Sequence, residues 1–107
     1  MYVYHGTSKG SLKEFEQMGY VPEGTYWGGQ NLAIQYAESF GKDAVVLRTK
    51  LHGRCAFKAN MALANQYYHD GELDVLPDED DVDFSMREYE SVVAGEAVFD
   101  YEVFDLK

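Results

Sequence analysis

The stretch Tyr2-Val3-Tyr4-His5-Gly6-Thr7-Ser8 joins a short β-prone run to a tetrapeptide suited to binding a ligand. Aromatic and β-branched residues favour a strand, and Gly6 marks the point where this strand is expected to end. Glycine lets a flat ligand lie against the main chain where a Cβ would collide, and the neighbouring imidazole and hydroxyl groups can bond it from either side. We therefore predict a ligand site that contains His5, Gly6 and Thr7.

The remainder of the chain predicts short helices and strands in irregular order. Capping residues, glycine stops and the spacing of apolar residues predict helices over 11–18, 32–40 and 58–68, and strands over 25–27, 44–51, 88–93 and 97–106. In the first two helices, Ser11 begins a capping-box pattern and Asn31 is the expected N-cap. The stretch 70–83, in which eight of fourteen residues are acidic, is expected to be a solvated loop. Without regular βαβ spacing, this order indicates an α+β fold.

Length and composition limit the classes of function. With 107 residues, one domain spanning 1–107 is expected. Nine tyrosines offer stacking faces and hydroxyl groups for a planar ligand. The formal charge of −10 disfavours general binding to nucleic acids, although five of the nine basic residues lie within 42–58 and could accept a phosphate locally.

The lone Cys55 and the absence of long apolar runs bear on compartment and on metal binding. One cysteine allows no intrachain disulfide, and the start of the chain has no pattern of an export signal. The longest apolar run, Ala44–Leu47, is far shorter than the roughly 20 residues that a membrane span requires. These observations predict a cytoplasmic protein with no membrane partner. His52 and Cys55 have a spacing seen in metal sites, but two ligands do not make a site, and we predict no bound metal.

Three stretches in order carry a resemblance to a known family. They are Tyr4-His5-Gly6-Thr7, then Gly24-Thr25-Tyr26-Trp27 followed by Ala33-Ile34-Gln35-Tyr36-Ala37, and finally Glu88-Tyr89-Glu90-Ser91-Val92-Val93. Together they resemble the ADP-ribosyltransferase family of the His-Tyr-Glu type, which includes diphtheria toxin and the poly(ADP-ribose) polymerases. The resemblance spans nearly the whole chain. It implies a compact fold with a split central sheet, mixed or antiparallel, short flanking helices and a cleft that binds NAD.

The resemblance also implies roles for individual residues. Tyr26 and Tyr36 would clamp the nicotinamide ring, Gly6 would bond its carboxamide through the main chain, and His5 would bond a ribose hydroxyl. A glutamate would stabilise the oxocarbenium-like transition state in which the bond between nicotinamide and ribose breaks. Glu90 is preferred because Ser91-Val92-Val93 after it is similar to the strand that carries the family's glutamate. Glu88 is the alternative, because residues two apart on a strand share a face.

The implied function is mono-ADP-ribosyl transfer from NAD to a macromolecular acceptor, a protein or a molecule that contains a nucleotide, with release of nicotinamide. A chain of this length has little room for an insertion that binds a growing polymer, so a single transfer is expected. One departure from the family concerns the nicotinamide amide: where the polymerases carry a hydroxyl on the helix that caps this amide, the chain has Ala33. Two alternatives remain: an inactive relative whose acidic face binds or inhibits a basic partner, and an enzyme that transfers an RNA 2′-phosphate to NAD.

Overall fold

β1 (Tyr2–Ser8) is an inner strand of a six-stranded antiparallel sheet in the computed structural model, which describes residues 1–104. The other elements are α1 (Lys9–Met18), β2 (Tyr26–Gly28), α2 (Gln30–Glu38), the 3-10 turn η1 (Gly41–Asp43), β3 (Ala44–Lys50), β4 (Phe57–Ala59), α3 (Met61–His69), α4 (Val82–Tyr89), β5 (Ser91–Ala94) and β6 (Glu102–Phe104). The strand order is β4-β5-β2-β1-β3-β6, and each pair of neighbours is antiparallel. The predicted α+β class is confirmed.

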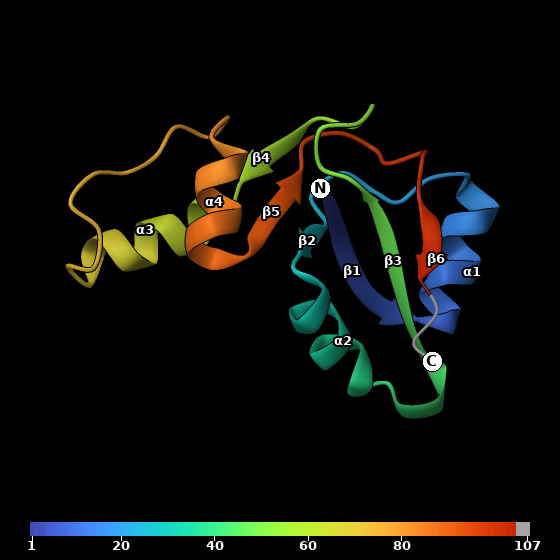
Figure 1. The fold of residues 1–107 in the computed structure, drawn as a ribbon. Coiled ribbons are helices and arrows are strands. Elements are labelled where there is room, and N and C mark those ends of the chain that lie inside the picture. The colour runs from blue at the N-terminus through green and yellow to red at the C-terminus, as the bar shows by residue number, and fades with distance from the viewer. Residues whose placement is uncertain (105–107) are drawn as a thin grey trace.

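The sheet is nearly interrupted between β1 and β2. β1 pairs with β3 along its whole length, from Tyr2 opposite Lys50 to Ser8 opposite Ala44. With β2, by contrast, it pairs only where Tyr4 lies opposite Gly28. Figure 1 shows the arrangement: α1 and α2 flank β1 and β3, whereas α4 lies against β4 and β5 and α3 projects away from the sheet beyond α4. The two parts of the sheet meet at a single pair of residues, so the strands can diverge on either side of it.

Helix α2 lies close against one face of β1 at Gly6. A Cβ on Gly6 would overlap the carbonyl oxygen of Ala33 and press on the main-chain nitrogen of Ala37. The missing side chain at Gly6 therefore admits a helix, and not only the flat ligand that the sequence predicts. Ala33 and Ala37 are buried together with Val46 of β3, so small residues on both elements allow the close approach.

The larger hydrophobic core covers the opposite face of the sheet. Val3, Leu47 and Trp27 are almost fully buried there. Phe15 of α1 packs into this cluster, and Met86 of α4 packs against it. Alternation along the strands explains the division, because successive side chains point to opposite faces of a sheet.

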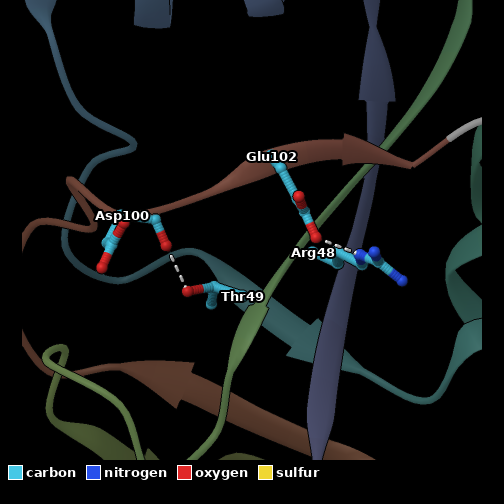
Figure 2. Close-up of polar contacts among 4 residues, drawn as sticks. All are labelled: Arg48, Thr49, Asp100 and Glu102. Atoms are coloured by element: carbon cyan, nitrogen blue, oxygen red, sulfur yellow. Dashed lines mark hydrogen bonds and ion pairs between the residues drawn. The ribbon is translucent and has the colours of Figure 1, made fainter.

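Polar contacts hold the edge strand β6 and the residues before it against β3. The Arg48 guanidinium donates to the Glu102 carboxylate at 2.5 Å, and the Thr49 hydroxyl donates to the main-chain carbonyl of Asp100, also at 2.5 Å (Figure 2). Strand 44–51 of the sequence analysis is thus confirmed as β3. Of the described part of the predicted segment 97–106, only Glu102–Phe104 forms a strand. Asp105 and Leu106 lie outside the described residues.

Several predicted boundaries near the start of the chain are wrong. β1 continues through the tetrapeptide to Ser8, so the strand does not end at Gly6. Helix α1 begins at Lys9, because the Ser8 side chain is its N-cap and accepts a hydrogen bond from the Ser11 main-chain N–H at 3.2 Å. Its predicted end at Gly19 is confirmed by a left-handed φ of 88°. Helix α2 begins at Gln30 with Gly29 as its N-cap, so it starts two residues before the predicted Leu32 and Asn31 is not its cap.

The second half of the chain departs further from prediction. The expected helix over 58–68 is divided into β4 and α3, with Asn60 as the N-cap of α3. The expected strand over 88–93 begins only at Ser91, because α4 runs to Tyr89. Glu88 is therefore helical and does not share a strand face with Glu90. The acidic stretch 70–83 is irregular only as far as Asp81, which caps α4 by accepting from the Phe84 main-chain N–H at 3.1 Å.

Candidate functional site

A cleft of about 500 Å³ opens where β1 and β2 diverge. Five of the seven predicted site residues line it: His5, Gly6, Tyr26, Tyr36 and Glu90. They come from three separate parts of the sequence: β1, the neighbouring elements β2 and α2, and the junction between α4 and β5. The volume lies within the range of small-molecule sites, about 300–1,000 Å³.

The other two predicted residues, Thr7 and Glu88, do not belong to this lining. Thr7 is buried and lies opposite Val45 of β3. Glu88 lies on α4, where its carboxylate contacts the Arg87 side chain at 3.4 Å. The structure thus separates the two candidate glutamates, since only Glu90 faces the cleft.

The His5 ring is held in a defined state by the main chain of β2. Its Nδ1 lies 2.6 Å from the carbonyl oxygen of Tyr26. A carbonyl can only accept, so Nδ1 carries the proton. Burial lowers the pKa of His5 below its ordinary value, and the hydrogen bond to Tyr26 opposes the shift only in part. The ring is therefore neutral at neutral pH, and its Nε2 can accept a hydrogen bond, for example from a hydroxyl group.

Two tyrosine rings are exposed at the cleft. Tyr26 is 56% exposed and Tyr36 is 63% exposed, so neither is a core residue. Tyr36 packs edge-on against Phe40, with ring centroids 5.9 Å apart. Large exposed aromatic rings beside a cavity provide faces on which a planar ligand can stack.

Glu90 is the one non-glycine residue with a positive φ within residues 1–104. It ends α4 in the left-handed region, at φ 53° and ψ 33°, and its N–H donates to the Met86 carbonyl at 3.0 Å. Glycine usually occupies this position, and an L-residue there costs roughly 1–2 kcal/mol. Unfavourable backbone of this kind persists where the surrounding structure enforces it, and it gathers at functional sites.

Gly28 and Gly29 make room for Glu90. A Cβ on Gly28 would overlap the Glu90 carbonyl oxygen, and the Gly29 N–H donates to that oxygen at 3.0 Å. A Cβ built on Gly29 would lie 3.1 Å from Oε1 of Glu90, so the carboxylate lies over the residue that caps α2. The start of a helix carries a partial positive charge, which favours a carboxylate in this place.

From the sequence these two glycines predict only a turn, and their contact with Glu90 is not apparent there. The Gly28-Gly29 pair, directly before a helix, was the available signal, because paired glycines are typical of close backbone approach. The contact itself joins residues about sixty positions apart and depends on β2 pairing with β5.

The cleft combines one negative charge with aromatic walls. Among the described residues that line it, Glu90 is the only acidic side chain, and none is Lys or Arg. Trp27 and Tyr4 add further aromatic surface. A carboxylate and exposed rings together favour a planar ligand that carries or develops positive charge.

Residues 1–104 contain neither a cluster of metal ligands nor a helix suited to a membrane. No group of three or more His, Cys, Asp or Glu side chains is placed to hold a metal ion. No helix in this part of the chain has the length and apolar character needed to cross a membrane.

Comparisons of the chain with family models, with curated proteins and with solved structures found no match. The function must therefore be inferred from the residues and the geometry of the cleft.

Proposed function

We propose that this chain binds NAD in the cleft and transfers its ADP-ribose to a macromolecular acceptor, with release of nicotinamide. The observation that carries the proposal is Glu90, a single carboxylate held in an unfavourable backbone conformation beside exposed aromatic rings. The acceptor is a protein or a molecule that contains a nucleotide, and one group is transferred per site. The lone cysteine favours action in the cytoplasm.

Each part of NAD is assigned to a group that lines the cleft. Tyr26 and Tyr36 stack on the nicotinamide ring, which is cationic in NAD. Nε2 of His5 accepts a hydrogen bond from a ribose hydroxyl. Gly6 offers main-chain groups to the carboxamide, since β2 pairs with β1 at Tyr4 alone and leaves this edge of β1 uncovered.

Glu90 acts on the charge that develops during bond cleavage. When the bond between nicotinamide and C1′ of the ribose breaks, its electron pair leaves with nicotinamide and positive charge develops on the sugar. A fixed carboxylate stabilises that charge more in the transition state than in the bound substrate, so it accelerates the step. The acceptor nucleophile then bonds to C1′ and loses its proton, which the Glu90 carboxylate accepts.

The substitution Glu90→Gln tests the proposal. Glutamine keeps the size of the side chain and removes its charge, so NAD should still raise the thermal midpoint of the variant. Turnover should fall by roughly 10² to 10³, the usual effect of losing one electrostatic contact to a transition state. The measurement is nicotinamide release from NAD in the presence of cell lysate, with labelled ADP-ribose located by mass spectrometry.

Glu88→Gln is the matched control, because it removes the same charge from α4 outside the cleft and should change turnover little. If Glu88→Gln abolished turnover and Glu90→Gln did not, the assignment of the two glutamates would be reversed. Failure of NAD to shift the midpoint of the native protein would remove the basis for the cleft as an NAD site. Binding of NAD without turnover by any lysate would support an inactive binding module.

A further inference from the structure

A buried hydrogen-bond network lies directly behind Glu90. The Ser85 hydroxyl, on a side chain with no exposed surface, donates to the Ser91 carbonyl at 2.5 Å and accepts from the Asn60 main-chain N–H at 2.9 Å. The Asn60 side-chain amide donates to the Ser91 hydroxyl at 2.8 Å. Ser91 is thus held through both its main chain and its side chain, and it is the residue that follows Glu90.

Both ends of the Asn60 amide are used. Its oxygen accepts from the Leu63 main-chain N–H at 3.2 Å and so caps α3, while its nitrogen reaches Ser91. The Leu63 contact fixes the orientation of the amide, because a main-chain N–H can only donate and a reversed amide would present its NH2 group to it. Asn60 is only 4% exposed, and satisfied polar groups in such surroundings make a rigid support.

We infer that Ser85 and Asn60 are positioning residues for Glu90. The left-handed conformation of Glu90 is unfavourable for glutamate, so it must be held from both sides. Gly29 holds its carbonyl on the α2 side, and Ser85 with Asn60 holds the next residue on the α3 and α4 side. The effect on turnover rests on the proposed function, whereas the effect on the backbone of Glu90 does not.

The substitution Ser85→Ala tests the backbone effect by hydrogen exchange. It removes the donor to Ser91 and the acceptor for Asn60. The Gly29 N–H donates to the Glu90 carbonyl, and the Glu90 N–H donates to the Met86 carbonyl. Both amides should exchange with solvent about tenfold faster than the loss of global stability explains. Amides of β3 should follow global stability alone.

Thr49→Val is the matched control. Thr49 is also a buried hydroxyl that donates to a main-chain carbonyl at 2.5 Å, but it lies on β3 and bonds Asp100 (Figure 2). This variant should lose similar global stability without extra exchange at Gly29 and Glu90. Asn60→Ser is a second test variant, because serine is an equally good N-cap but its shorter side chain has no amide to bond Ser91.

Turnover gives a second readout. For Ser85→Ala and Asn60→Ser, kcat for nicotinamide release should fall by about tenfold to a hundredfold with KM for NAD nearly unchanged, since a displaced carboxylate affects the reacting charge more than ligand binding. Thr49→Val should keep the native kcat.

The inference is overturned if Gly29 and Glu90 exchange in Ser85→Ala only as fast as global stability requires. Should Ser85→Ala fail to fold, Asn60→Ser decides by the same comparison. A native protein that releases no nicotinamide would refute the proposed function, and the exchange measurements would still settle whether Ser85 and Asn60 hold Glu90.

Discussion

The imidazole of His5 links the cleft to the stability of the folded chain. The ring lies against Trp27, with centroids 5.2 Å apart, and burial lowers its pKa below the ordinary value of about 6.5. In the unfolded chain the ring regains that ordinary value. Between the two pKa values the unfolded chain binds more protons than the folded one, so acid favours unfolding in this range.

We therefore expect the contribution of His5 to stability to be complete above about pH 6.5 and to fall as the pH drops from there toward the folded pKa. Urea unfolding of the native protein and of His5→Gln, compared from about pH 8 to about pH 5, measures it. The native protein should lose free energy of unfolding relative to the variant as the pH falls. A difference that stays constant or widens in favour of the native protein would contradict the lowered pKa.

At the scale of single residues, the sequence predicted which side chains line the cleft better than it predicted the packing role of each residue. His5, Tyr26, Tyr36 and Glu90 line the cleft as expected, because distinctive residue types stand out in the chain. The packing role of Gly6 could not be predicted, because the atom that excludes a Cβ there is a main-chain oxygen of α2. Such contacts depend on tertiary packing, which a local pattern does not contain.

Helix α2 and strand β1 are in close main-chain contact beside the cleft. The main chains meet at Gly6, and the same helix carries Tyr36 into the cleft. A change at Gly6 therefore acts on the whole helix, because a rigid element moves as a unit when its contact surface is pushed outward.

Gly6→Ala should lower the free energy of unfolding by about 1–3 kcal/mol, the usual cost of forcing an extra methyl into a packed interface. Gly10→Ala is the control: Gly10 lies in α1, where a Cβ would meet nothing closer than the Ser8 hydroxyl at 3.8 Å. Alanine there should raise stability by about 0.5–1 kcal/mol through its better helix propensity. Urea unfolding measures both, and equal effects of the two substitutions would refute the close contact of α2.

At the scale of elements, α4 shows why prediction failed in the second half of the chain. Its acidic start resembles a solvated loop, yet Asp81 is a cap, and Val82 and Met86 pack against the core. The spacing of Val82, Met86 and Tyr89 by four and three is a helical signal that the acidic run concealed. Strand β4 has only three residues, too few for alternation to distinguish it from the start of α3.

The whole molecule carries a formal charge of −10, and its ion pairs are largely exposed. Exposed pairs contribute little, whereas repulsion among the excess acids opposes folding. Between about 0.01 M and about 1 M NaCl the screening length falls from about 30 Å to about 3 Å, which removes most of that repulsion.

The thermal midpoint should therefore rise by about 2–6 °C over this range, equivalent to about 0.5–1 kcal/mol for a chain of this size. Scanning calorimetry at the two salt concentrations measures the shift. The double variant Asp78→Asn with Asp80→Asn removes two charges from the acidic stretch, so its midpoint should rise less. A midpoint that falls with salt would show that attractive pairs outweigh the repulsion.

The order of strands in the sheet has a consequence for synthesis on the ribosome. β5 inserts between β4 and β2, although it is made long after β2. At a synthesis rate of about 5–20 residues per second, Tyr26 and Tyr36 leave the ribosome several seconds before Glu90 does. Long-range strand pairings of this kind also fold slowly, because distant segments must first find one another. Any chemistry that requires Glu90 is therefore withheld from the growing chain until residues 91–94 have entered the sheet.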